Sequence, residues 1–433
     1  MAIDGKTLIT KSKSHSPREA AFLAVFATLK EEQFASNFLE SWRNSESPSS
    51  ADFHLAQEIA YGTIRMALSL DYLAAEASQK KKLSLKLKEK ALLRTAVYQM
   101  FFLERIPSYA VVNETVAIAK QHFHSVFSSF LNALLRNLSS STAVSRIMPL
   151  PEGKSPKELS IRYSYPQFFV EKLIHDYGLE KSISIMEAEN RSSPTMLRVR
   201  DPNRNNEFAF AIKKIEGSHL SVAEVIDSSA ISKIAASSDY YIQNVTPIAL
   251  IEKLSLGSSQ PETILDLCSA PGGKLLLAHD LYPKARLYAN DVNPQKLALL
   301  QQNIDKYGLQ VDVSCGPGEN YPGHGPFDLI ILDVPCSNTG VLNKRPEARW
   351  RLSKESISAL KSTQIALLQK AFTLLSEKGE VWYLTCSILK QENEEMIRKA
   401  CNLLHAQSRT METIVPSPAG WDGGFGCAIV PMR

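Results

Sequence analysis

The sequence predicts a chain of several domains: an all-α N-terminal domain, an α+β segment, and a C-terminal α/β domain built on a parallel sheet. Three observations carry this prediction. The chain has 433 residues, which is room for two or three domains of about 100–200 residues. Apolar residues recur at helical spacing over residues 16–140. From residue 262 onward, short apolar strands alternate with amphipathic helices, the pattern of βαβ units.

The N-terminal domain, expected over residues 1–140, reads as successive helices. The first begins with Ser16-Pro17-Arg18-Glu19, a capping box with proline at the first helical position. Further helices are expected over residues 52–73, 91–105, 110–124 and 127–138.

A serine- and proline-rich stretch from 139 to 156 lacks periodicity and predicts a linker, assigned to residues 141–156. The α+β segment follows over residues 157–255. It combines helices at 166–177 and 180–190 with strand-like pieces at 196–200 and 240–243.

The C-terminal domain, expected over residues 256–433, alternates regularly. Strands are predicted at 263–268, 286–291, 328–335 and 379–386, and helices at 294–308, 353–375 and 392–404. Parallel sheets of this Rossmann-like kind bind ligands beyond the carboxyl ends of their strands, so candidate site residues are sought there.

Composition limits the protein class. Hydrophobic residues make up 44% and charged residues 22%, which is typical of a globular protein. No stretch approaches the roughly 18–20 apolar residues of a membrane span, and the first fifteen residues lack the apolar core of a secretory signal. We therefore expect a cytoplasmic protein without a membrane partner, and a monomer.

Charge, cysteine and glycine are unevenly distributed. Residues 1–150 carry a net charge of +5 and the remainder −1, which favours either an anionic partner such as nucleic acid for the N-terminal end or a solvated surface with spare lysines.

All 6 cysteines and 14 of the 19 glycines follow residue 255, and the cysteines include no C-x-x-C pair. Zinc is therefore not expected, and the chemistry should lie in the C-terminal domain.

The first strand of this domain leads into a glycine turn, Asp266-Leu267-Cys268-Ser269-Ala270-Pro271-Gly272-Gly273-Lys274. Such a turn lets a ligand approach the backbone at a helix N-terminus. Asp291, at the end of the next strand, stands where a ribose diol would be held. The spacing is not G-x-G-x-x-G, so a nucleotide-like ligand is favoured over a dinucleotide. A turn that binds nothing is the structural alternative.

Two later strands end in cysteines. Asp333-Val334-Pro335-Cys336 closes one apolar strand, and Thr385-Cys386 closes the next. A single buried cysteine usually acts as a small hydrophobic residue. Two at strand ends, with an acid nearby, instead predict reactive thiols.

These motifs carry a resemblance. DLCSAPGGK, DVPCSNTG and TCSILKQENEE resemble motifs of the RNA cytosine-C5 methyltransferases, which use S-adenosylmethionine. The N-terminal segments DFHLAQEIAYGTIR and LRTAVYQMFFLERIPSYAVVNETVAIAK resemble the helical RNA-binding domain of NusB-type antitermination factors. Together they are similar to the bacterial Sun/Fmu family of 16S rRNA m5C methyltransferases, over nearly the whole chain.

The resemblance implies roles for the site residues. Cys386 would be the nucleophile that adds to cytosine C6, Asp333 the acid at N3, and Cys336 the group that assists proton removal and release of the product. S-adenosylmethionine would be held by Asp291, by Asp333 and by the glycine turn, that is, by Cys268, Ser269, Ala270, Pro271, Gly272, Gly273 and Lys274. The substrate implied is 16S rRNA.

The chain also departs from the family pattern. The acid that usually holds the adenine at the end of the third strand is missing from the segment Cys315–Glu319, where Glu319 is a possible substitute. Leu275, Asn244 and Lys390 replace residues usual in the family.

Other candidate RNA contacts are the loop Arg345–Arg351 and the lysine-rich stretch Lys80–Lys90, each of which could equally be a solvated surface or a packed loop. His122 and His124 form an H-x-H pair for which metal binding is not expected.

Three other functions fit parts of the pattern. A sister enzyme could modify another rRNA cytosine or a tRNA, although the NusB-like domain argues against it. A non-catalytic RNA-binding factor is disfavoured by the intact Asp333, Cys336 and Cys386. A nicotinamide-dependent oxidoreductase is disfavoured by the absence of G-x-G-x-x-G.

Overall fold

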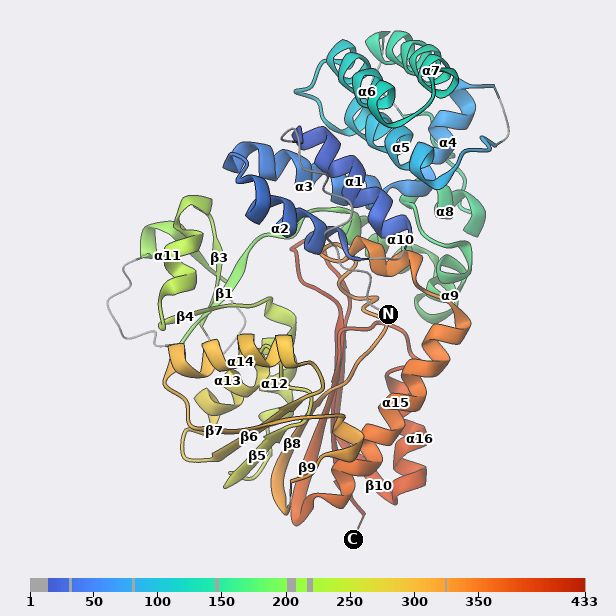
Figure 1. Cartoon of the computed structure of the whole chain (residues 1–433). Helices are drawn as coiled ribbons and strands as arrows, with labels where there is room; N and C mark the ends of the chain where they lie inside the picture. The colour runs from blue at the N-terminus through green and yellow to red at the C-terminus, as the bar shows by residue number, and fades with distance from the viewer. Residues whose placement is uncertain are drawn as a thin grey trace. The chain divides into compact units, whose positions relative to one another are not determined.

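The computed structural model describes residues 15–30, 33–79, 82–144, 148–200, 208–215, 221–323 and 325–432. The chain divides into two compact units, Met1–Glu171 and Lys172–Arg433 (Figure 1). The first is helical, and the second contains both sheets.

The helical unit is built from α1 to α8. Their bounds are α1 Pro17–Leu29, α2 Ala35–Glu46, α3 Ser50–Arg65, α4 Ala67–Ala77, α5 Leu87–Phe102, α6 Ser108–His122, α7 Ser125–Val144 and α8 Pro156–Tyr163. Ser16 caps α1 as predicted, because its side chain accepts a hydrogen bond from the Glu19 amide at 3.2 Å. α1 and α5 are buried along much of their length, so they form the core of this unit.

Three features of this unit differ from the sequence-based expectation. The single helix expected over 52–73 is interrupted at Met66, which separates α3 from α4. α7 continues to Val144, into the stretch expected as a linker. α8 lies with the helical unit because Ser69 and the Leu68 amide of α4 form hydrogen bonds to the Ile161 carbonyl and the Ser164 hydroxyl, at 2.7 and 2.9 Å.

The second unit begins with helices and a small antiparallel sheet. α9 spans Gln167–Tyr177 and α10 spans Leu179–Asn190. The sheet has the order β2-β3-β1-β4, formed by β1 Met196–Val199, β2 Ile212–Ile215, β3 Val222–Val225 and β4 Tyr240–Ile242. The short α11, Ile231–Ala236, and α12, Val245–Ser255, complete the segment.

The larger sheet has seven strands in the order β10-β11-β9-β8-β5-β6-β7. Five are parallel: β5 Thr263–Asp266, β6 Arg286–Asp291, β7 Val311–Cys315, β8 Phe327–Asp333 and β9 Leu375–Thr385. The antiparallel strands β10, Ala406–Ile414, and β11, Gly424–Pro431, extend the sheet beyond β9. The predicted Rossmann-like α/β domain is thus confirmed, with three strands, β7, β10 and β11, that periodicity did not reveal.

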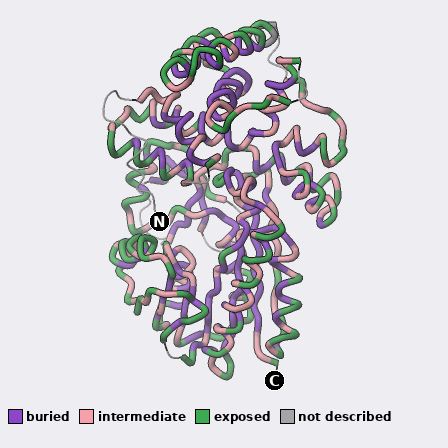
Figure 2. Tube along the Cα trace, turned by 45° about the vertical axis from the view of Figure 1, so that its right-hand side comes forward, coloured by how far each residue is buried: buried purple, intermediate pink, exposed green. Residues whose placement is uncertain are grey.

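Helices cover both faces of this sheet (Figure 1). Ile264, Leu329 and Ile331 pack with α12, α13 (Gly273–Leu281) and α14 (Pro294–Tyr307) on one face. The residues between them in sequence, such as Leu265 and Ile330, pack on the other face with α15 (Lys354–Thr373) and α16 (Glu394–Leu404). Side chains of a strand point alternately to opposite faces, so both faces are buried, as Figure 2 shows along the strands.

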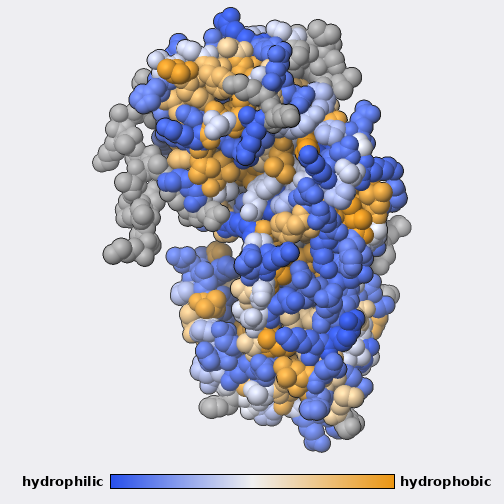
Figure 3. Space-filling model, turned by 90° about the vertical axis from the view of Figure 1, so that its right-hand side faces the viewer, coloured by the Kyte–Doolittle hydropathy of each residue, from blue (hydrophilic) through white to orange (hydrophobic). Residues whose placement is uncertain are grey.

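The outer surface of α15 and α16 is mostly hydrophilic, as the lower part of Figure 3 shows. In the described part of the chain, no helix is both long and apolar enough to cross a membrane.

Candidate active site

The carboxyl ends of β5, β6, β8 and β9 lie at one edge of the large sheet, because these strands are parallel and adjacent. β5 ends at Asp266, β6 at Asp291 and β8 at Asp333, while Cys386 directly follows β9. This edge therefore brings together acids and thiols that are up to 120 residues apart in sequence.

The turn after β5 depends on its glycines. Gly272 has φ +101°, and a Cβ there would lie 2.6 Å from Leu300. A Cβ at Gly273 would lie 2.9 Å from the ring of Tyr241. A side chain at either position would collide with a neighbour, so the tight turn between β5 and α13 requires glycine at both positions.

Asp266 is buried at the base of this turn, and its carboxylate oxygens lack hydrogen-bond partners among the described residues. The residue is 1% exposed. The Cys268 amide and the Ser269 side chain lie close enough to influence it, but neither reaches it with hydrogen-bond geometry, and the Ser269 hydroxyl is itself unpartnered. Burial, with the nearby charge of Asp333, raises the pKa of Asp266 to about 7. A cationic group bound here would satisfy this carboxylate.

Asp291 is held against the same turn. One carboxylate oxygen accepts the Ala270 amide at 3.1 Å, and the other accepts the Asn293 amide at 2.9 Å. The side chain is therefore fixed beside the glycine turn, at the place expected for a sugar-binding acid.

Asp333 forms an ion pair with Lys274, at 2.6 Å between Nζ and Oδ2. Burial alone would lower the pKa of Lys274, but the charges of Asp333, Cys386 and Asp266 together raise it. Lys274 therefore remains an ammonium group and links the glycine turn to the end of β8.

The two cysteines expected to react are in direct contact. The sulfurs of Cys336 and Cys386 lie 3.2 Å apart, and the Cys386 sulfur also lies 3.2 Å from Oδ1 of Asn338. The hydrogen bond to Cys386, followed by burial, raises the pKa of Cys336 well above its usual value. Cys336 thus remains a thiol in contact with the sulfur of Cys386.

A buried carboxylate, Glu392, fixes the loops that carry these cysteines. It accepts the Ser337 amide at 3.0 Å, the Ser387 hydroxyl at 2.7 Å and the Gln364 side-chain amide at 3.0 Å, and it also accepts the Ser337 hydroxyl. Ser337 and Ser387 each follow one of the cysteines directly. Sequence analysis missed Glu392, although it lies within the TCSILKQENEE motif.

The remaining cysteines are not part of this cluster. Cys315 is exposed at the end of β7, Cys401 lies in α16, and Cys427 is buried in β11. Cys268 lies in the glycine turn, where burial raises the pKa of its thiol. Glu319, the possible adenine contact, is exposed, and its charge also acts on Cys268. No group of three possible metal ligands occurs among the residues that the structure describes.

Part of the loop Arg345–Arg351 is packed against the rest of the protein, so this part is not available to contact RNA. Arg349 is 0% exposed and donates to the Asn190 side chain at 3.0 Å, and Pro346 and Glu347 are buried. Arg349 therefore has a structural role. In the lysine-rich stretch, Lys80 and Lys81 lie outside the described residues.

Comparisons with known proteins identify the family of the chain. The sequence model of the family described as 16S rRNA methyltransferase RsmB/F matches residues 253–432, and that of the NusB family matches residues 15–140. Ribosomal RNA small subunit methyltransferase B of Vibrio vulnificus is 30% identical over 369 residues, which cover 80% of this chain and 82% of the relative. The protein of the same name from Serratia proteamaculans is 26% identical and covers 97% and 99%.

Solved structures show the same fold. The crystal structure of PH0851 superposes with a TM-score of 0.74 at 21% identity, covering 97% of this chain and 100% of that one. NSun6 from Pyrococcus horikoshii, solved with SFG, has a TM-score of 0.55 at 15% identity and covers 63% and 99%. Family matches, identity and fold agree: the chain belongs to the RsmB/F family of 16S rRNA methyltransferases and carries a NusB-family domain at its N-terminal end.

Proposed function

We propose that this chain methylates C5 of a cytosine in 16S rRNA, with S-adenosylmethionine as methyl donor and Cys386 as a covalent nucleophile. The observation that carries the proposal is the contact of two thiols at the ends of adjacent strands, next to the ion pair of Asp333 and Lys274. The names of the curated relatives support the class of substrate.

The residues around the glycine turn fit S-adenosylmethionine. This ligand carries an amino group, a ribose and a cationic sulfonium. The unsatisfied carboxylate of Asp266 and the unpartnered Ser269 hydroxyl suit the amino group, and Asp291 suits the ribose diol. When bound, S-adenosylmethionine supplies the electrophilic methyl group. NSun6 was solved with SFG, an analogue of this cofactor, which supports the assignment.

Cys386 begins the reaction on cytosine. Its thiolate adds to C6, which forms a sulfur–carbon bond and makes C5 nucleophilic. The proton that the Cys386 thiol gives up passes to the carboxylate of Asp333, which is paired with the Lys274 ammonium, and from there to N3, where it neutralises the charge that builds up. C5 then takes up the methyl group while it still carries its own proton.

Cys336 acts in the second half of the reaction. Its hydrogen bond to Cys386 is the largest cause of its raised pKa. Once Cys386 has become a thioether this cause is removed, although burial still raises the pKa, and we assign Cys336, 3.2 Å from that sulfur, as the group that loses its proton to solvent and becomes the base. Its thiolate then removes the proton from C5, the sulfur–C6 bond breaks, Cys386 leaves as a thiolate, and the proton on N3 returns through Asp333 to solvent.

Two experiments test the proposal. Bisulfite sequencing of 16S rRNA from cells with and without the protein should reveal one cytosine that loses its C5 methyl group. Cys336→Ala should accumulate a protein–RNA species that survives denaturing gel electrophoresis, and the double variant that also lacks Cys386 should not. Normal turnover by Cys336→Ala, or a band that persists without Cys386, would contradict the assigned roles.

A further inference from the structure

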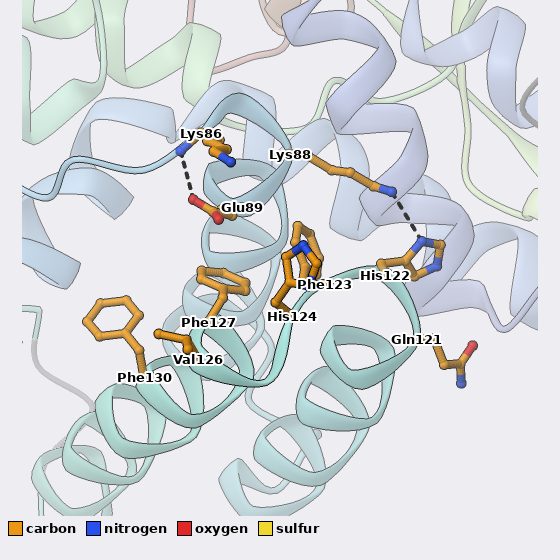
Figure 4. A pocket seen from close by; sticks show the side chains of 10 residues that line it. All are labelled: Lys86, Lys88, Glu89, Gln121, His122, Phe123, His124, Val126, Phe127 and Phe130. Atoms are coloured by element: carbon orange, nitrogen blue, oxygen red, sulfur yellow. Dashed lines mark hydrogen bonds between the residues drawn. The ribbon is translucent and has the colours of Figure 1, made fainter.

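The helical unit contains a groove of about 840 Å³ that the proposed reaction does not use. It lies between the beginning of α5 and the turn that joins α6 to α7 (Figure 4). All ten of its lining residues belong to the helical unit, and they are mainly of two kinds, basic and aromatic.

The basic side of the groove comes from α5. Lys86 precedes this helix and is exposed, and Lys88 lies in its first turn. Among the described residues, neither lysine forms an ion pair with an acidic side chain. Glu89 is the one acid in the lining, and its carboxylate accepts the Lys86 amide at 2.8 Å. The charge of the groove is therefore positive.

Lys88 is held in place by its neighbours. Its ammonium group lies 3.3 Å from Nδ1 of His122, whose Nε2 lies 2.6 Å from the Glu19 carboxylate. It also lies 5.5 Å from the ring centroid of Phe123. Burial lowers the pKa of Lys88, so an anion that approaches this ammonium would replace lost solvation.

The aromatic side comes from the start of α7. The rings of Phe123 and Phe127 are 4.8 Å apart between centroids, and those of Phe127 and Phe130 are 6.3 Å apart. Phe130 is partly exposed, and the neighbouring Val126 is 81% exposed. Apolar rings beside lysines that form no ion pair with a carboxylate among the described residues make a surface that accepts both a flat ring and an anion. The upper part of Figure 3 shows that hydrophobic side chains also reach the surface elsewhere in this unit.

We infer that this groove binds a single-stranded segment of the substrate RNA, with phosphates at Lys86 and Lys88 and an unpaired base against Phe130. The inference rests on the proposed function, because it requires an RNA substrate. Single-stranded RNA combines a phosphate backbone with bases that stack on aromatic side chains, which matches both sides of the groove. An acidic peptide would match the lysines but would leave the rings without flat partners.

Binding of a fluorescent 12-nucleotide single-stranded RNA of mixed sequence to the full chain tests the inference. Lys86→Ala and the double variant Lys86→Ala/Lys88→Ala should bind more weakly, and the slope of log affinity against log salt should fall by about 0.7 for each lost phosphate contact. Phe130→Ala should weaken binding by about 5- to 150-fold and leave that slope unchanged.

Matched controls lie in the same unit. Lys157 is an exposed lysine of α8, and Tyr109 is a 70% exposed aromatic residue of α6; neither lines the groove. Lys157→Ala and Tyr109→Ala should bind the RNA as the unmodified chain does. Thermal unfolding of every variant establishes that it is folded before its affinity is compared.

Crosslinking locates the bound RNA. The same RNA with 4-thiouridine should crosslink to the peptide that contains Phe123–Phe130. The inference is overturned if the unmodified chain binds RNA but the groove variants match the controls, or if a glutamate-rich peptide displaces the RNA as well as unlabelled RNA does. A chain that binds no RNA would overturn the proposed function as well, so the two failures are distinguishable.

Discussion

The two halves of the active-site edge are constructed in opposite ways. Behind the cysteines, Ser337 and Ser387 are satisfied by the buried carboxylate of Glu392. At the glycine turn, Asp266 and the Ser269 hydroxyl are buried without partners among the described residues. Leaving a buried polar group unsatisfied costs about 1–3 kcal/mol. The difference indicates that the thiols are positioned by the protein alone, whereas the turn is completed by a ligand.

The comparison predicts first that the two halves can be disabled separately. Cys386→Ala should reduce methyl transfer by roughly 10³-fold or more, because the nucleophile is lost. Cofactor affinity should stay the same, since Cys386 is not part of the glycine turn. Methyl incorporation into 16S rRNA and calorimetry with S-adenosylmethionine measure the two quantities. A parallel loss of cofactor affinity would show that the halves are not independent.

Substitutions of Glu392 test whether this residue holds the loops of Cys336 and Cys386 in position before substrate binds. Glu392→Ala should lower the free energy of unfolding by about 3 kcal/mol, because four buried donors lose their acceptor. Glu392→Gln keeps the shape and should cost less than half as much. Denaturant unfolding measures both, with the exposed Glu395→Ala of α16 as a control that should change little. Single-turnover methylation should recover in Glu392→Gln relative to Glu392→Ala. Equal rates in these two variants would remove the positioning role.

The glycine-turn half, where Asp266 is buried without a partner among the described residues, can be tested by the pH dependence of protein stability. A carboxyl group whose pKa rises from 3.8 to about 7 on folding keeps its proton where the unfolded chain has already lost it. The folded state then binds more protons, so this group makes stability fall as the pH rises from about 4 to about 7, by at most about 4 kcal/mol.

The difference in unfolding free energy between the unmodified chain and Asp266→Asn isolates this effect from other titrating groups. Measured at pH 5 and pH 7.5, Asp266→Asn should gain stability relative to the unmodified chain at the higher pH. Saturating S-adenosylmethionine should reduce the dependence, because a bound cation stabilises the ionised carboxylate. A pH-independent difference would contradict the raised pKa.

The last prediction concerns Asp291 and the ribose of the cofactor. Asp291→Ala should weaken binding of S-adenosylmethionine by about 1.5–3 kcal/mol for each lost hydrogen bond to the ribose. Asp312→Ala, an exposed carboxylate on the neighbouring β7, provides the control. Calorimetry should give an unchanged dissociation constant for the control alone. If Asp291→Ala also has an unchanged dissociation constant for S-adenosylmethionine, the ribose does not bind at Asp291.

Local pattern was enough to predict four of the five parallel strands, all but β7, and the edge at which Asp291, Asp333, Cys336 and Cys386 gather. It did not reveal β10 and β11, because their exposed and buried residues do not alternate clearly near the C-terminus. Their positions depend on pairing with β9.

Long-range contacts were equally invisible in the sequence. Glu392 acts on Ser337, 55 residues away. The groove of the helical unit joins Lys86 and Lys88 to Phe123 and Phe130, and none of these residues is distinctive by itself. The assignment of α8 to the helical unit likewise depends on contacts with α4.

Side chains of β8 enter two different hydrophobic cores in turn, which fixes the number of residues in the strand that leads to Cys336. Leu329 and Ile331 belong to one hydrophobic core, and Ile330 and Leu332 to the other. Insertion or deletion of one residue within this strand would exchange the two faces. Because both cores must stay filled, the number of residues in this strand cannot change by one, and the distance along the chain from the core to Asp333 and Cys336 is fixed with it.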